Sequence, residues 1–192
     1  RNGTEDTRVD QAYMVVPMSP VTLTAGDQKA TWGNGFHVNS DKKPNRIKLG
    51  MKINKDTSVG IFSDPKTAGT PAVENGQAGG VTLVTKAAGF KMGLLHKPKG
   101  ALTDIFVDGA IEASHTMIKF EYATADGALM SSATATDADS QTGMFLQVVQ
   151  PLSESLVVFG AMVSTTGGYQ ANDDFGPVST VGGGAHKTAW TT

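Results

Sequence analysis

Strand-like runs occur in pairs along this chain, each pair joined by a tight turn and followed by a longer polar stretch. The tight turns are expected near 17–20, 54–58, 86–89, 113–116 and 151–154, and the polar stretches near 33–45, 65–79, 97–103, 127–141 and 167–179. Strands of about ten residues with short turns at one end and long loops at the other are typical of transmembrane β-barrels. The pattern therefore predicts an all-β fold, an antiparallel up-and-down transmembrane β-barrel.

Alternation of apolar and polar residues is clearest in residues 46–54. The odd positions are Ile47, Leu49, Met51 and Ile53, and the even positions are Arg46, Lys48, Gly50, Lys52 and Asn54. Successive side chains of a strand point to opposite faces, so this period of two indicates a strand with one apolar face. The return strand is expected at 57–63.

A second hairpin is expected from 104–113 and 116–124, where Ile118, Phe120 and Tyr122 alternate with Lys119 and Glu121. A two-residue turn at 114–115 would pair Ile111 with Ile118, Val107 with Tyr122 and Gly109 with Phe120. The same register brings Lys119 within reach of Asp108 and Glu112. Both faces agree with this register, which favours the pairing.

Three further hairpins and one single strand complete the expected sheet. The hairpins pair 11–16 with 21–28, 80–86 with 90–97 and 143–150 with 155–165, and the last strand lies within 180–192. This gives about 10–11 strands in one domain or segment that spans residues 1–192, with no helix longer than a turn or two.

Composition excludes several other classes of protein. The net charge is −2, so no basic excess points to nucleic acid. The chain has no Cys, which excludes disulfides and thiolate metal sites. No run of about 18 apolar residues is present, so no transmembrane helix is expected.

Residues suited to catalysis are scattered, so we expect no enzyme, no cofactor and no metal site. The four histidines are His37, His96, His115 and His186, and none has the spacing of a metal site. His115 falls in a predicted turn and is expected to be exposed. Two aspartate pairs in polar loops, Asp137 with Asp139 and Asp173 with Asp174, could touch a divalent cation, although such pairs are common in solvated loops.

A soluble β-sandwich alternates in the same way as a barrel, with its apolar face against a second sheet instead of lipid. Long strands and the regular alternation of short and long connections favour the barrel. Aromatic residues near strand ends fit an interfacial belt, namely Tyr13, Trp32, Phe36, Tyr122 and Tyr169. A secreted or surface-assembled β-sandwich with a structural or adhesive role stays open as the alternative.

The N-terminal part of the chain resembles the Gram-negative outer-membrane porins. The resemblance rests on an Ala-Tyr strand at 12–17, a return strand at 20–28 of the pattern Val-x-Leu-x-x-Gly-x-Gln, and Trp32-Gly33-Asn34-Gly35-Phe36 after it. It implies a barrel of about sixteen strands, of which five or six would lie outside this chain. One departure is the end of the chain, Trp190-Thr191-Thr192, where porins carry a terminal aromatic residue.

The resemblance implies a channel in the outer membrane for passive diffusion of small hydrophilic solutes and ions. Its expected partners are membrane lipid and those solutes. Porins are often homotrimers, although no residue here indicates a trimer interface. The porin constriction loop is not evident, and 65–79 is its best candidate.

A barrel would divide the alternating residues between a lumen and lipid. The predicted pore-lining residues are Arg46, Lys48, Lys52, Lys91, Asp104, Asp108, Lys119 and Glu121, and the predicted lipid-facing residues are Ile47, Leu49, Met51, Ile53, Ile118, Phe120 and Tyr122. Basic and acidic walls on opposite sides would create a transverse field that tunes ion selectivity. Alternatively, the charged residues form an ordinary solvated sheet surface.

Overall fold

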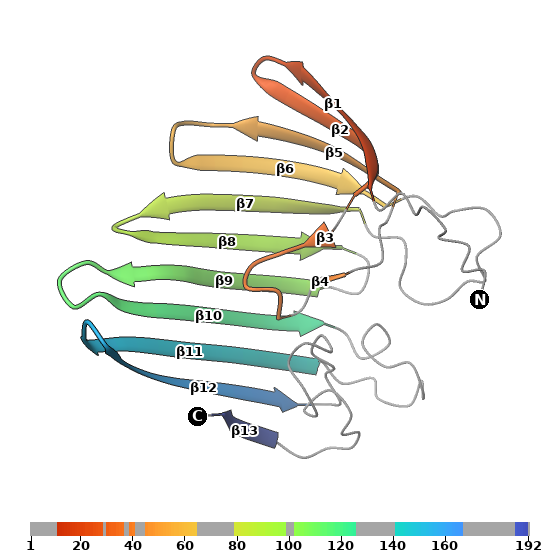
Figure 1. The fold of residues 1–192 in the computed structure, drawn as a ribbon. Coiled ribbons are helices and arrows are strands. Elements are labelled where there is room, and N and C mark those ends of the chain that lie inside the picture. The colour runs from red at the N-terminus through yellow and green to blue at the C-terminus, as the bar shows by residue number, and fades with distance from the viewer. Residues whose placement is uncertain are drawn as a thin grey trace, which may run out of the picture.

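The computed structural model describes residues 11–28, 30–36, 39–40, 45–64, 79–98, 102–125, 141–166 and 187–191. This part of the chain forms one 11-stranded antiparallel sheet and a separate two-stranded sheet (Figure 1). The described residues contain no helix that is long and apolar enough to cross a membrane. The predicted all-β, antiparallel up-and-down arrangement is therefore confirmed.

Each strand of the main sheet pairs with the strands that flank it in the chain, except that the small sheet is inserted between β2 and β5. The strands are β1 (Ala12–Met18), β2 (Val21–Asp27), β3 (Ala30–Thr31), β4 (Asn39–Ser40), β5 (Asn45–Lys52), β6 (Thr57–Ser63), β7 (Gly80–Ala87), β8 (Phe90–Lys97), β9 (Leu102–Ile111), β10 (Thr116–Ala125), β11 (Gln141–Ser153), β12 (Leu156–Thr166) and β13 (Lys187–Thr191). All the predicted hairpins and the predicted last strand are present.

The main sheet is open, with β1 and β13 at its two edges. These two strands do not pair with each other, so the described residues do not close into a barrel. Figure 1 shows the tight hairpin turns together at one end of the sheet, on the left. Short connections therefore share one end, as the sequence predicted.

The turns have residues that suit their backbone conformations. Ala88 and Gly89 form the loop between β7 and β8 with φ angles of 48° and 82°. Positive φ at both central residues is the mark of a type I′ turn, whose twist matches the flanking strands. In the loop between β5 and β6, Asn54 Oδ1 accepts hydrogen bonds from Asp56 N (2.9 Å) and Thr57 N (2.8 Å).

The predicted register between β9 and β10 was wrong by two residues. Ile111 pairs with Thr116, Gly109 with Ile118 and Val107 with Phe120. The loop at 112–115 is longer than predicted, because Ser114 N donates to Ile111 O (3.3 Å) and the next residue turns back with a φ of 54°. A shift of two residues keeps every side chain on its predicted face, so the alternation could not reveal it.

The register assigns the strand residues to two faces. We call the face that carries Ile47, Leu49 and Met51 the apolar face, and the opposite face, with Arg46 and Lys48, the charged face. On strands β5–β12, all described Asp, Glu, Lys and Arg residues lie on the charged face. The apolar face of these eight strands carries none.

Phenylalanines lie over glycines on neighbouring strands at three points of the sheet. The pairs are Phe62 with Gly80, Phe106 with Gly93, and Phe90 with Gly109. A Cβ atom on Gly80 would approach the Phe62 ring to 2.7 Å, so each glycine provides the space that the ring occupies. An aromatic residue opposite a glycine helps to fix register, because a slip would lose the fit. The sequence predicted such a pair between Gly109 and Phe120, but Phe90 covers Gly109 instead.

Candidate functional site: the charged face and the turn that packs on it

Residues 32–36, which we call the inner turn, pack on the charged face far from their own hairpin. In Figure 1, β3 and β4 lie in front of the sheet, over its middle strands. The Trp32 ring meets Phe106 of β9 edge to face at 5.2 Å, and the Phe36 ring stacks on Phe145 of β11 at 5.9 Å. Phe36 is fully buried. The inner turn thus covers strands β9–β11.

Gly33 and Asn34 attach the inner turn to β9 and β10. Asn34 N donates to Glu121 Oε2 (2.6 Å), and Asn34 Nδ2 donates to Phe120 O (2.8 Å) and Val107 O (3.4 Å). A Cβ atom on Gly33 would lie 2.7 Å from Glu121 Oε2, and this residue has a φ of +57°. Only glycine fits here without strain, because the position combines a left-handed backbone with close contact.

Beneath the inner turn lie two carboxyl groups, Asp104 of β9 and Glu121 of β10, and both side chains are fully buried. The register places them diagonally on the charged face, since Asp104 pairs with Ala123 and Glu121 with Phe106. Neither Asp104 oxygen has a hydrogen-bond partner among the described residues, nor does the indole N–H of Trp32. The Asp104 carboxyl group nevertheless lies close enough to Glu121 and the Trp32 indole to interact with both. Burial of two neighbouring carboxyl groups with poor hydrogen-bond geometry costs free energy, so this position is not optimised for stability.

Arg46 of β5 forms a short, half-buried ion pair with Asp64, which follows β6. Arg46 Nε and one terminal nitrogen donate to the two oxygens of Asp64 at 2.6 and 2.7 Å, a bidentate geometry. The guanidinium carbon also lies 4.3 Å from the centre of the Phe62 ring. These contacts hold Arg46 in one orientation at the edge of the charged face.

Next to this ion pair, Lys48 and Lys97 face a small cavity between the sheet and the inner turn. The cavity has a volume of about 50 Å³, and Trp32, Arg46, Phe62 and Leu95 also line it. The Lys48 stem crosses Gly60, where an added Cβ atom would lie 3.5 Å from Lys48 Cε. Among the described residues, no carboxylate lies within ion-pair distance of either lysine.

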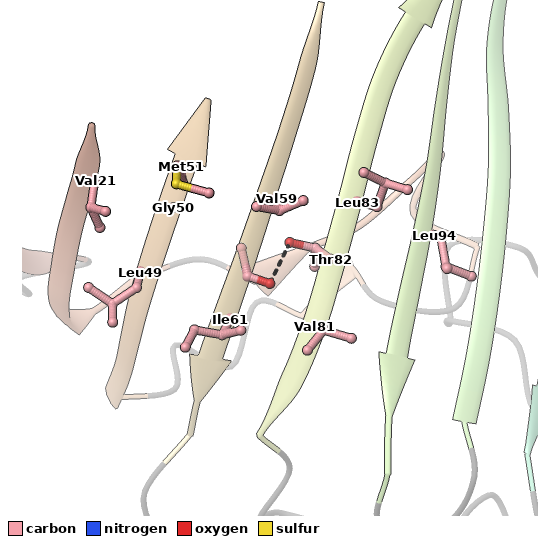
Figure 2. A pocket seen from close by; sticks show the side chains of 11 residues that line it. Val21, Leu49, Gly50, Met51, Val59, Ile61, Val81, Thr82, Leu83 and Leu94 are labelled. Atoms are coloured by element: carbon pink, nitrogen blue, oxygen red, sulfur yellow. Dashed lines mark hydrogen bonds between the residues drawn. The ribbon is translucent and has the colours of Figure 1, made fainter. Parts of the chain in front are cut away.

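On the apolar face, large side chains remain exposed on strands β5–β9. Figure 2 shows a shallow apolar depression over β2 and β5–β8. Its lining includes Val21, Leu49, Met51, Val59, Ile61, Val81, Leu83 and Leu94. Ile61 is 54% exposed and Val81 is 46% exposed. The inner turn packs on the opposite face, and no described segment covers this one.

The eight residues predicted to line a pore all lie on the charged face, but in different surroundings. Asp104 and Glu121 are buried beneath the inner turn, whereas the others are exposed or half-buried. Lys91, Asp108 and Lys119 pair directly across three neighbouring strands. On these strands the half-buried acid Asp108 lies between two lysines, and the separation into a basic and an acidic wall stays a prediction.

The residues predicted to face lipid lie on the apolar face, apart from Ile53, which follows the end of β5 in the turn. Two of the five aromatic residues predicted for an interfacial belt instead belong to the inner turn, Trp32 and Phe36. Tyr169 lies outside the described residues, as do both aspartate pairs and nearly all of the constriction-loop candidate, 65–78.

The inner turn and Lys97 are the functional candidates that the sequence reasoning missed. The signal was present in the sequence, since two aromatic residues and two glycines within Trp32–Phe36 are unusual for a solvated loop. Alternation alone did not reveal that this segment packs on strands about 70 to 90 positions further along.

Histidines do not form a metal centre in the part of the chain described here. His96 Nδ1 lies 3.1 Å from Thr103 Oγ1 on the neighbouring strand, and His115 is exposed in its turn, as predicted. The described residues contain no group of three or more His, Cys, Asp or Glu suited to a metal ion. His37 and His186 lie outside the described residues.

Comparison of the chain with protein-family models, with curated proteins and with solved structures gave no match. The similarity to porins therefore remains an interpretation of the residues quoted above.

Proposed function

We propose that this chain forms part of the wall of a porin-like channel in an outer membrane, through which small hydrophilic solutes and ions diffuse passively. One observation carries the proposal: strands β5–β12 keep all of their described charged residues on one face, while the other face exposes large apolar side chains. A lipid-facing wall requires this division, because a charge at the bilayer midplane costs about 2–4 kcal/mol.

The exposed side chains argue against water as the neighbour of the apolar face. Soluble monomers rarely expose apolar patches larger than a few hundred Å², whereas here exposed apolar residues continue from strand to strand across β5–β9, in part shown in Figure 2. Contact with lipid would remove this apolar surface from water without burying any charged side chain. The strands of the main sheet, seven residues or longer except β13, run side by side, so that the apolar residues form a continuous band.

Solutes would move along the charged face, and no covalent chemistry is involved. The charged side chains that remain exposed or half-buried on this face are mainly basic, since Asp104 and Glu121 are buried and Asp64 is paired with Arg46. Charged side chains that line a pore select ions by sign. We therefore expect a preference for anions, with pore width as the second filter.

The test is to fractionate the source cells, extract the full-length protein and record from planar lipid bilayers. The proposal predicts that the protein fractionates with outer membranes, needs detergent for extraction and produces stepwise conductance. Replacing Lys48 by Glu should move the reversal potential in a salt gradient toward cations and leave the fold intact. A Lys55→Glu control, at an exposed turn residue, should change the reversal potential less.

A soluble protein without conductance would refute the proposal. That outcome would favour a β-sandwich, in which a second sheet covers the apolar face.

A further inference from the structure

The cavity beneath the inner turn concentrates positive charge without matching negative charge. Three basic side chains line it, Arg46, Lys48 and Lys97, and only Arg46 has a carboxylate partner, Asp64. The charges of Arg46 and Asp64 cancel each other, which leaves the charges of Lys48 and Lys97 at one small cavity. Like charges so close repel one another, and the repulsion grows where protein replaces water.

The lysines come from different strands, so their meeting at one cavity depends on the fold. Lys48 reaches it from β5 across Gly60, which offers no side chain to block the way. Lys97 stands at the end of β8 and is half-buried. Phe62 and Trp32 line the same cavity and offer apolar walls on which the lysine stems can rest.

We propose that this cavity binds a small oxyanion, a phosphate or carboxylate group, between Lys48 and Lys97. The inference deepens the proposed function, on which it rests, by naming the class of solute that the channel favours. A cavity of about 50 Å³ holds a few water-sized groups, which suits the oxygens of one such anion. Bound there, the anion relieves the repulsion between the two lysines and accepts charge-assisted hydrogen bonds from both.

Two acidic groups, Asp64 and Asp104, lie near the cavity. Asp64 is occupied by Arg46, and Asp104 lies on the next strand, diagonal to Lys97 on the same face. Asp104 does not line the cavity. Neither acid therefore occupies the place that the anion would take beside Lys48 and Lys97.

Binding can be measured without any conductance, because Trp32 lines the cavity and the chain has only two tryptophans. The full-length protein, in uncharged detergent and with Trp190→Phe to isolate Trp32, is titrated with sodium phosphate and separately with sodium acetate. Sodium chloride holds the ionic strength constant. A saturable change in Trp32 fluorescence with either oxyanion is expected.

Three variants and one control test whether the fluorescence change comes from binding at this cavity. Lys48→Gln and Lys97→Gln should each raise the half-saturation concentration about tenfold or more, because each removes a charge-assisted hydrogen bond. Lys97→Arg should restore most of the binding, which separates loss of charge from loss of fold. Lys52→Gln is the matched control, since it removes the same charge from the same strand and face but away from the cavity, and it should have little effect.

No saturable response to either oxyanion overturns the inference, and so does an equal loss with Lys52→Gln. Conductance without a fluorescence response would leave the channel standing and remove the site. A response without conductance would leave the site standing and remove the channel. A change with sodium chloride alone would show that any anion suffices and would overturn the preference for oxyanions.

Discussion

Gly93 provides the sharpest test of how the inner turn is held. A Cβ atom on Gly93 would overlap Cε1 of the Phe106 ring and lie 2.9 Å from Cζ and 3.0 Å from Cδ1. Phe106 is only 2% exposed, and its ring is held by Trp32 at 5.2 Å on one side, with Lys91 Nζ 5.5 Å from its centre. Gly93→Ala therefore forces the ring into space that the inner turn occupies.

The expected cost has two parts. Overpacking of a well-filled site costs about 1–3 kcal/mol, and loss of the edge-to-face contact with Trp32 accounts for about 0.5–1.5 kcal/mol of that sum. We expect Gly93→Ala to lower the free energy of unfolding by about 2 kcal/mol, within that range. Equilibrium denaturation of the detergent-solubilised protein, followed by tryptophan fluorescence, measures it. The Trp32 emission should also move to longer wavelength as the indole becomes more exposed.

Gly50→Ala is the matched control, because it lies on the same face of the sheet and an added Cβ atom there would meet nothing within 4 Å. It should be neutral or stabilise by up to about 1 kcal/mol, since alanine restricts the unfolded chain. Equal effects of the two substitutions, or an unchanged Trp32 spectrum in Gly93→Ala, would refute the reasoning.

Three other substitutions test separate contacts. Asp104→Asn should raise the midpoint of thermal unfolding, because it removes a buried acid that lies beside another carboxyl group; a lower midpoint would mean that the contacts of Asp104 with Glu121 and Trp32 outweigh the cost of burying it. Asn34→Ala should cost about 1–3 kcal/mol in denaturant unfolding, because the carbonyls of Phe120 and Val107 lose a donor; no change would mean that water replaces it. Ile61→Arg should reduce insertion into lipid vesicles at a cost of about 2–4 kcal/mol, whereas Ile61→Leu should not; equal insertion would argue against lipid contact.

Strands, hairpins and faces could be predicted from the sequence because each depends on residues near one another in the chain. The alternation through Ile47, Leu49 and Met51 fixes which side chains share a face, and the order of hairpins follows from short turns. The register of β9 with β10 could not be predicted, since a shift of two residues leaves both faces unchanged. The longer turn decides it, through the hydrogen bond from Ser114 N to Ile111 O and the positive φ of His115.

The inner turn and its cavity were beyond such reasoning for a different cause. Asn34 bonds to Glu121, which is 87 positions away in the chain, so no local pattern shows the contact. The buried Asp104 gave no sign either, because its alternation is that of any polar residue on a half-exposed strand. Closure of the sheet, the lipid environment and the solute stay predictions, which the experiments above address.

In the main sheet each strand pairs with its neighbours in the chain. If the sheet forms the wall of a barrel, this order limits how the diameter of the barrel can change. A hairpin such as β7–β8 is a complete unit with one upward and one downward strand, so its loss would leave β6 and β9 antiparallel and with their faces still matched. Barrel diameter grows roughly in proportion to strand number. Gain or loss of whole hairpins would thus adjust pore size in steps of two strands, whereas a change by a single strand would reverse the direction of every strand that follows.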